Sequence, residues 1–466
     1  MSSGELLGGH VSIPSHAAAR ALTIEAASQP AKRSLSRPES IVFVAGPFGP
    51  FLRVLANNLR SRNCRVTRLI LNGGDLLDWG FRDAAIFKSG PELWGNWVHE
   101  QLRRVNASDI VVYNDSNPYC ASAIAEARRL NVSVHVLEQG YFRPHWVTLE
   151  RDGVNGASRL PRSPGFYRRA ARELLATPPK PVGRITPTAV RNLIFHHLAM
   201  WLSTPIFAGY RAPYAYGVAR QCISHIVRFG RQRLQKREQE SELLRRLERA
   251  GPVFVALMQR PGDSQLLRHS TIGTTANFIE TVIANFAANA PENAQLVFKG
   301  HPLDHGIEPH ALSIARIAED LGVSDRCLFL DGGHLASLLR TAAGVVTVNS
   351  TAGLTAIEFG RPTVALGAAI YDMPGMTHQS GLDSFWTKPQ APDPSLYLCF
   401  RKVVMALTQI NGAFSTPSNM KMAAEGICRR LFDQGTDNVV ADPSLIDLQV
   451  AVSSGSTQSR KVAPAK

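Results

Sequence analysis

The sequence has few cysteines and no long hydrophobic run. Six cysteines are scattered along 466 residues, and no two of them form a Cys-x-x-Cys pair. This spacing indicates reduced thiols in the cytosol rather than a disulfide scaffold. No apolar stretch reaches the roughly 18 residues that a membrane-spanning helix needs, because the best candidate, residues 193–208, contains His196, His197 and Pro205. The sequence predicts a cytoplasmic protein that is in solution or lies on a membrane surface.

The N-terminal segment lacks the pattern of a signal peptide. No early basic cluster precedes an apolar core there. Residues 1–38 are instead rich in Ser, Ala and Pro, and the segment after residue 435 is polar. We therefore expect disordered tails at both ends of the chain.

Basic residues outnumber acidic residues in the sequence. The chain has 51 Lys and Arg against 37 Asp and Glu, so its formal net charge is +14. Such a charge attracts phosphate in some form. No RNA-binding motif, zinc finger or recognition helix is evident, so no nucleic-acid partner is expected. Either the surface is simply basic, or it serves an anionic membrane and a nucleotide donor, which is the interpretation that we favour.

Strands and helices alternate in two separate parts of the chain. Hydrophobic residues make up 44% of the sequence, enough to fill two domain cores in a chain of this length. Short apolar runs that end in Gly, Pro, Asn or Asp recur over residues 41–137 and again over 253–366. Alternation of this kind predicts parallel sheets, hence an α/β fold with two doubly wound, Rossmann-like domains.

The region between the two series differs in composition. It is basic and aromatic, and it ends in a charged helical pattern at residues 232–249. That pattern is typical of a solvated or coiled helix, and the alternative is a face that leans on anionic lipid. The predicted boundaries are 1–39 for the N-terminal tail, 40–185 for the N-terminal domain, 186–250 for the connecting region, 251–395 for the C-terminal domain, 396–435 for closing helices and 436–466 for the C-terminal tail.

One loop of the second domain has the composition of a phosphate site. The apolar strand before residue 349 delivers Asn349, Ser350, Thr351 and Gly353 to the start of a helix. Helix N-termini bind phosphate through free backbone N–H groups and the helix dipole. The alternative is ordinary N-capping by Ser or Thr.

A second loop of that domain adds positive charge. Lys299, His301 and Pro302 stand at the end of another predicted strand. His301 is suited to donate a hydrogen bond to a phosphate oxygen, and Lys299 contributes charge. The alternative is a solvated loop histidine. The histidines of the chain fit no standard zinc spacing, so no metal is expected.

Two carboxylates follow neighbouring strands of the first domain. Asp115 and Glu138 are both placed at predicted strand ends. A carboxylate beside a reacting sugar acts as nucleophile or as general base. The alternative for either residue is that it caps a helix or pairs with an arginine such as Arg143. The sequence leaves open which of the two acids takes part in the reaction.

Further cleft residues are predicted from the rule that ligands bind at the carboxyl ends of parallel strands. All of them lie in loops that follow predicted strands. These residues are Gly46, Gly49, Asp75, Tyr141, Arg143, Asp263, Ser264, Gln265 and His378.

Several of these loops together resemble the capsule polysaccharide biosynthesis family of the KpsS/LipB type, over about residues 41–415. The resemblance implies a GT-B-like fold, in which the two domains face each other across a cleft, with acceptor in the first and CMP-sugar in the second. It implies a retaining β-Kdo transferase that uses CMP-Kdo, and KpsS-type members place the first Kdo on lysophosphatidylglycerol. The segments that carry it are 46–51, 72–75, 138–144, 153–156, 263–265, 301–304, 331–333, 346–353 and 371–379.

The resemblance also implies roles for the site residues and the partners. Glu138 is the implied catalytic carboxylate, and His301 with Ser350 or Thr351 holds the CMP phosphate without a metal or other cofactor. The implied partners are CMP-Kdo, a lipid or glycan acceptor, the inner-membrane surface and other capsule synthesis or export proteins. The alternative is a non-catalytic capsule assembly or export factor at the inner membrane. The residues alone do not decide between retention and inversion.

Overall fold

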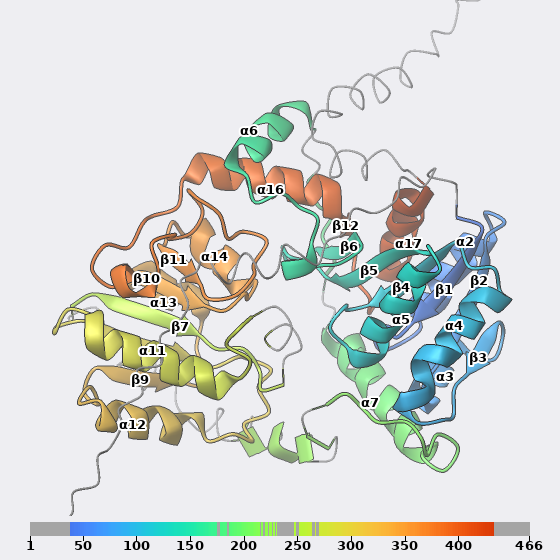
Figure 1. Ribbon diagram of the computed structural model, residues 1–466, viewed down its shortest axis with the longest axis horizontal. Helices are drawn as coiled ribbons and strands as arrows, with labels where there is room; N and C mark the ends of the chain where they lie inside the picture. Colours follow the sequence, from blue (N-terminus) through green and yellow to red (C-terminus); the bar gives the residue numbers. More distant parts are fainter. Residues whose placement is uncertain are drawn as a thin grey trace, which may run out of the picture. The chain divides into compact units, whose positions relative to one another are not determined.

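The computed structural model describes most of the chain between residues 38 and 432 (Figure 1). The predicted tails and the charged segment 232–249 lie outside the described residues, apart from residues 38, 39 and 247. The described residues are 38–174, 178–183, 186–214, 216, 217, 220, 221, 223–225, 227, 228, 230, 247, 251–262, 266 and 270–432.

A seven-stranded sheet organises the first part of the chain, which we call the first lobe. Its strand order is β12-β6-β5-β4-β1-β2-β3. The strands from β3 to β5 run parallel, whereas β6 is antiparallel to β5 and β12 is antiparallel to β6. The strands are β1 (Ser40–Val44), β2 (Arg65–Ile70), β3 (Ala84–Ile86), β4 (Asp109–Tyr113), β5 (Ser133–Gln139), β6 (Trp146–Arg151) and β12 (Gln409–Asn411).

Helices cover both faces of this sheet. Successive residues of β1 point to opposite faces, so Ile41 and Phe43 join one hydrophobic cluster while Val42 and Val44 join the other. The first cluster includes α2 and α17, and the second includes α4 and α5. The helices of this lobe are α2 (Phe51–Arg60), α3 (Gly73–Trp79), α4 (Trp94–Arg104), α5 (Pro118–Arg129), α6 (Pro164–Glu173) and α7 (Thr186–Leu202), with the 3₁₀ turns η1 (Pro91–Leu93) and η2 (Asn155–Ala157).

The second lobe is built on a five-stranded, fully parallel sheet in the order β11-β10-β7-β8-β9. Its strands are β7 (Val253–Leu257), β8 (Gln295–Lys299), β9 (Cys327–Leu330), β10 (Ala342–Thr347) and β11 (Thr363–Ala365). Its helices are α11 (Thr275–Asn289), α12 (His310–Asp320), α13 (Leu335–Thr341), α14 (Ala352–Glu358) and α15 (Leu382–Phe385). Two parallel-sheet lobes confirm the predicted α/β class.

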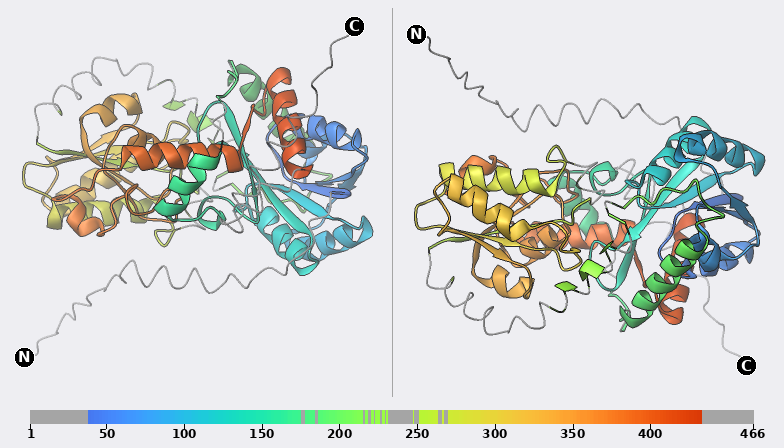
Figure 2. Two further views of the ribbon diagram at one scale, coloured as in Figure 1. Left: turned by 90° about the horizontal axis from the view of Figure 1, so that it is seen from above. Right: turned by 90° about the horizontal axis from the view of Figure 1, so that it is seen from below.

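The C-terminal segment returns to the first lobe. Helix α16 (Pro394–Thr408) packs against α6, as both views of Figure 2 show, and Arg168 of α6 pairs with Asp393 at 2.6 Å. Strand β12 then pairs with β6, and α17 (Pro417–Phe432) packs on α2. The two predicted closing helices therefore exist, but an unpredicted strand between them extends the first sheet.

The predicted end of the strand before Glu138 needs correction. The sequence placed Glu138 in a loop after a strand that ends at Leu137. In the structure β5 continues to Gln139, and Glu138 pairs with Thr148 of β6. Because β6 runs antiparallel to β5 and borders it, this strand supplies the hydrogen bonds that extend β5 by two residues.

Candidate active site

Glu138 lies near the carboxyl end of β5 and is half-buried. Its Oε2 accepts a hydrogen bond from Nδ2 of Asn155 at 3.4 Å. Asn155 belongs to the turn η2, which follows β6. The turn after the β5–β6 hairpin therefore holds the carboxylate while leaving it partly exposed to solvent.

Asp115, the competing carboxylate, is engaged in holding the fold. It is only 6% exposed, and its Oδ2 accepts a hydrogen bond from the backbone N–H of Val154 at 3.1 Å. Its Oδ1 accepts from the hydroxyl of Ser116 at 2.9 Å. These contacts tie the loop after β4 to the loop after β6, and Asp115 is the more buried of the two carboxylates.

A chain of hydrogen bonds connects Glu138 to a buried carboxyl group. The hydroxyl of Tyr141 donates to Oε1 of Glu150 at 2.5 Å and accepts from the backbone N–H of Asn155 at 3.0 Å. Burial raises the pKa of Glu150 to about 7, against hydrogen bonds from Ser158 and Tyr141 that lower it. Asn155 thus bonds to both Glu138 and Tyr141, and Tyr141 bonds to Glu150. Tyr141 itself is buried.

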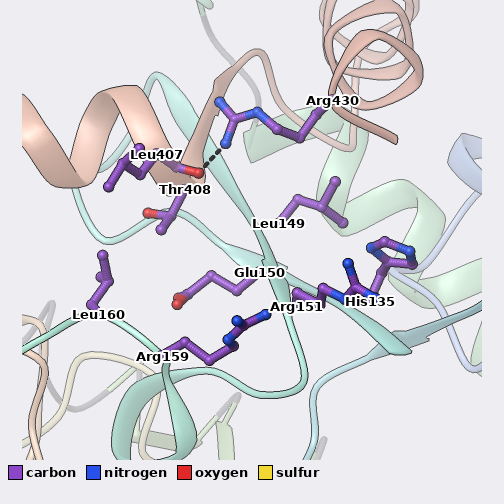
Figure 3. Close-up of a pocket in the computed structure, with 9 residues that line it drawn as sticks. All are labelled: His135, Leu149, Glu150, Arg151, Arg159, Leu160, Leu407, Thr408 and Arg430. Carbon is purple, nitrogen blue, oxygen red and sulfur yellow. Dashed lines mark hydrogen bonds between the residues drawn. The ribbon is translucent and has the colours of Figure 1, made fainter. Parts of the chain in front are cut away.

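A small cavity of about 30 Å³ lies beside Glu150 (Figure 3). Its walls come from β5, β6, the loop at Arg159 and Leu160, and the facing ends of α16 and α17. Arg430 of α17 donates to the backbone carbonyl of Leu407, which closes one side of the cavity. This volume holds about one water molecule, so the cavity is too small for a sugar. The residues that line it are His135, Leu149, Glu150, Arg151, Arg159, Leu160, Leu407, Thr408 and Arg430.

In the second lobe, His301 follows β8 and its ring orientation is defined by the backbone. Its Nδ1 accepts a hydrogen bond from the N–H of Leu303 at 3.0 Å. In the neutral ring the proton must therefore be on Nε2. Burial, followed by the charges of Arg260 and Arg143, lowers the pKa of His301 to about 4. At neutral pH the residue is an uncharged donor through Nε2–H.

The two lobes contribute to one electrostatic environment. Arg143 comes from the first lobe and Arg260 from the second, and both charges act on His301. Burial, and then the charge of Glu138, raises the pKa of Tyr113 to about 12. The same two arginines act in the opposite direction and lower it. Arg143 and Arg260 therefore act on His301 and also on Tyr113, the residue on which the charge of Glu138 acts.

Arg228, from the connecting region, fixes the His301 loop. The guanidinium is 6% exposed and donates to the carboxylate of Asp331 through Nη2 at 2.7 Å and through Nε at 3.0 Å. It also donates to the backbone carbonyls of His301 and Pro302, at 3.1 and 3.2 Å. One buried side chain thus joins the loop after β8 to the loop after β9.

The Ser350 loop follows β10, as predicted, and its polar groups are well engaged. The Oγ of Ser350 accepts from the N–H of Ala352 at 3.2 Å, and its carbonyl accepts from the hydroxyl of Tyr371 at 2.6 Å. Gly353 is required for packing, because a Cβ there would approach Oη of Tyr371 to 2.3 Å. The capping interpretation therefore accounts for Ser350. Thr351 occupies the N-cap position without a side-chain cap bond in the described helix α14.

Two further predicted donors of the second lobe are buried. Lys299 ends β8, and its Nζ donates to the carbonyl of Gly300 at 3.2 Å. Asn349 accepts a hydrogen bond from Gln259 at 2.9 Å. Both residues therefore support the loops around His301 and Ser350 from the protein interior.

Some residues predicted to line a cleft have structural partners instead. Asp75 is buried and pairs with Arg68 at 2.8 Å. His378 is 4% exposed, and its Nε2 lies 2.9 Å from the hydroxyl of Ser384. Gly46 and Gly49 lie in the loop after β1, where a Cβ on Gly49 would collide with a side chain of α7. Residues 263–265 lie outside the described residues.

No group of three or more His, Cys, Asp or Glu side chains in the described part of the chain is arranged to hold a metal ion. The expectation that the reaction needs no metal stays a prediction. The sequence analysis gave no role to Arg228, Arg260 or Asn155, although Asn155 lies in segment 153–156 of the family resemblance. Arg260 comes soon after the predicted strand 253–257, a signal that could have marked it, whereas Arg228 meets the His301 loop only across 73 residues of chain.

Comparison with known proteins identifies the family. Residues 108–415 match the family described as "Capsule polysaccharide biosynthesis protein". The chain is 31% identical over 394 residues to the "Capsule polysaccharide modification protein LipB" of Neisseria meningitidis serogroup A, covering 82% of this chain and 92% of LipB. It is 29% identical over 377 residues to the "Capsule polysaccharide export protein KpsS" of Escherichia coli, covering 80% of this chain and 96% of KpsS. The chain therefore belongs to the capsule polysaccharide biosynthesis protein family, as its motifs predicted.

Two solved structures are similar at a lower level. One is Thermosulfurimonas dismutans KpsC, a beta Kdo 2,7 transferase, with a TM-score of 0.39 and 13% identity, covering 84% of this chain and 98% of that chain. The other is Anabaena HepE in complex with UDP-glucose, with a TM-score of 0.30 and 13% identity, covering 90% of this chain and 100% of that chain. At these TM-scores neither likeness supports a conclusion about the activity of this chain.

Proposed function

We propose that the protein is a glycosyltransferase of capsule biosynthesis that moves Kdo from CMP-Kdo to a lipid or glycan acceptor. Family membership supports the pathway, and the motif resemblance supports the donor. The observation that carries the proposal is that Arg143 of the first lobe and Arg260 of the second both act on His301 and on Tyr113, the residue on which the charge of Glu138 also acts. A carboxylate and a cation-rich phosphate site close together are what transfer from a nucleotide sugar needs.

The second-lobe loop binds the leaving group. When the bond between the sugar carbon and the phosphate oxygen breaks, CMP keeps the electron pair and negative charge grows on the phosphate. The Nε2–H of His301 donates to that oxygen, while Arg260 and Arg143 stabilise the charge. Because Arg228 fixes the loop before the reaction begins, little reorganisation is needed.

The first-lobe carboxylate acts on the sugar or on the acceptor. In a retaining course Glu138 attacks the sugar carbon, and the acceptor hydroxyl then displaces it with loss of a proton. In an inverting course Glu138 accepts the proton of the acceptor hydroxyl directly. The hydrogen bond from Asn155 orients the carboxylate in either case.

The test is transfer of Kdo from freshly generated CMP-Kdo to a fluorescent lysophosphatidylglycerol, together with calorimetric measurement of CMP binding. The native protein is compared with Glu138→Gln, which keeps the shape and removes the charge. Glu319→Gln, on the exposed side of α12, is the matched control for loss of one carboxylate. We expect product from the native protein and the control, no product from Glu138→Gln, and CMP binding by all three.

Other outcomes separate the parts of the proposal. CMP binding without product would reject this sugar or acceptor, and a panel of other acceptors would then be required. Absence of both product and CMP binding would reject the transferase and favour the assembly or export factor. Equal loss of CMP affinity in Glu138→Gln would reject the role assigned to Glu138.

A further inference from the structure

Helix α7 exposes an apolar face. Seven of its aliphatic and aromatic side chains are between 41% and 70% exposed, and Trp201 is the most exposed of them. In a globular protein a helix normally turns its apolar residues toward the core, and a contiguous exposed patch of this kind marks an interaction surface. The seven residues are Val190, Leu193, Ile194, Phe195, Leu198, Trp201 and Leu202.

The opposite face of α7 is firmly attached to the first lobe. His196 is buried, with its Nδ1 2.7 Å from Oδ2 of Asp78 of α3. Gly73 and Gly74 permit the close approach, because a Cβ at either would lie within 2.6 Å of atoms of α7 or of the residue just beyond it, Ser203. The exposed face is therefore presented by a fixed helix, and the two glycines of the 72–75 motif are explained by this packing.

The patch continues beyond α7. Leu77 and Phe81, on and just after the neighbouring helix α3, are 51% and 79% exposed. Ile206, a few residues after α7, is 59% exposed. Figure 1 shows α3 and α7 side by side, in agreement with their direct packing.

The segment that contains α7 is positively charged, and the two acids beside Leu77 and Phe81 are paired, Asp78 with His196 and Asp83 with Arg60 and Arg82. Residues 174–237 contain ten Lys and Arg and not one Asp or Glu. Arg191 is exposed on α7 itself, and Arg82, with 77% of its side chain exposed, follows Phe81. An apolar helical face with Trp and Phe, set among arginines, has the chemistry that binds an anionic phospholipid surface.

We propose that the exposed face of α7, with Leu77 and Phe81, docks on an anionic phospholipid bilayer. The helix lies in the interface, since none of the described helices is long and apolar enough to cross a membrane. The proposal goes beyond the transfer reaction, because binding requires neither CMP-Kdo nor acceptor.

The experiment is co-sedimentation of the full chain with two kinds of vesicle. One contains phosphatidylglycerol and phosphatidylcholine, and the other contains phosphatidylcholine alone. The variant Ile194→Ser/Phe195→Ser/Trp201→Ser removes the exposed side chains without touching the buried face. We expect the native protein to prefer the anionic vesicles and the variant to bind them roughly tenfold more weakly or worse.

A matched control comes from exposed leucines elsewhere. Leu312 of α12 and Leu398 of α16 are 72% and 63% exposed, so Leu312→Ser/Leu398→Ser removes exposed apolar side chains from two other helices. This control is expected to bind vesicles like the native protein. CMP affinity, measured for every variant, shows whether folding and the donor site are intact, which separates this proposal from the proposed function.

Three results would overturn the proposal. The first is equal binding of the native protein to both kinds of vesicle or to neither. The second is equal loss of binding in the α7 variant and in the leucine control. The third is native vesicle binding by the α7 variant together with a change in its sedimentation coefficient, which would make the face a contact with a second copy of the chain.

Discussion

The candidate site residues of the two lobes differ in the charge of their side chains. In the first lobe Glu138, Glu150 and Asp115 form an acidic wall that is held by hydrogen bonds from Tyr141, Asn155 and backbone N–H groups. In the second lobe a neutral histidine lies among arginines. Similar backbone architecture thus carries a group of carboxylates in one lobe and a histidine among arginines in the other, and the side chains make the difference.

The two sites also differ in how they are held. The first-lobe site is fixed by neighbours on the β5–β6 hairpin and the turn after it, all close in sequence. The second-lobe loop is fixed by Arg228, which lies 73 residues before His301 and 103 residues before Asp331 in the sequence. Local support is expected to survive single substitutions better than support through one distant side chain.

The largest expected effect separates the two first-lobe carboxylates. Glu138→Gln should reduce kcat about 10³-fold, since loss of a catalytic carboxylate commonly costs 10² to 10⁴, and it should leave the melting temperature unchanged. Asp115→Asn should lower the melting temperature, because Asp115 anchors Val154. Thermal unfolding and initial rates on the same preparations decide the matter. Unchanged stability in Asp115→Asn with a loss of rate as large as that of Glu138→Gln would reverse the assignment.

The next effect concerns the distant support of the second lobe. Arg228→Met should lower the free energy of unfolding by about 3 kcal/mol, because it leaves Asp331 and two part-buried carbonyls without this donor. CMP affinity should fall as well. Arg401→Met is the control, since its exposed pair with Glu358 is worth less than about 1 kcal/mol. Urea unfolding monitored by fluorescence measures both, and equal losses would contradict the role of Arg228.

A smaller effect depends on pH and tests the acidic wall. Glu150 has a pKa of about 7 in the folded protein against 4.5 ordinarily. The folded state thus holds an extra proton between these values, and the associated stability is lost as pH rises through about 7. Relative to Glu150→Gln, the native protein should lose about 2 kcal/mol between about pH 5 and pH 8. Denaturant unfolding at several pH values gives the slope, with Glu319→Gln as control. A parallel pH profile for the native protein and Glu150→Gln would refute the raised pKa.

The smallest effect tests the histidine of the cationic site. His301 has a pKa of about 4, and a bound phosphate should raise it. CMP binding should therefore take up a proton, increasingly so as pH falls from 7 toward 5. His301→Ala should weaken CMP binding about tenfold, whereas His301→Gln keeps a donor and should lose only the proton uptake. Calorimetry in buffers of different ionisation enthalpy measures this, and proton uptake by His301→Gln equal to that of the native protein would contradict the assignment.

The sequence predicted the parallel strands well because their apolar runs are local and end in turn residues. It placed His301 and Ser350 correctly after strands for the same reason. It missed β12, since three residues without a distinctive pattern form a strand only by pairing with β6, far away in sequence. The extension of β5 through Glu138 was missed for the same cause.

The role of individual side chains was harder to predict than the strands. Asp75, Asp115 and Glu138 were all predicted to follow strands, yet the first two are buried, in contact with Arg68 and Val154. Burial depends on what packs above a loop, and that information is spread over the chain. Arg228 lies in a segment without clear periodicity, so no pattern distinguished it from the other arginines there.

The placement of α17 has a consequence for how the chain is made. On the ribosome, the apolar face of α2 emerges early, but the helix that covers it begins only at Pro417. Until then the nascent first lobe exposes Leu55 and Leu59 to solvent or to a chaperone. A stop codon before residue 417 would therefore produce a chain that is defective at its beginning as well as at its end.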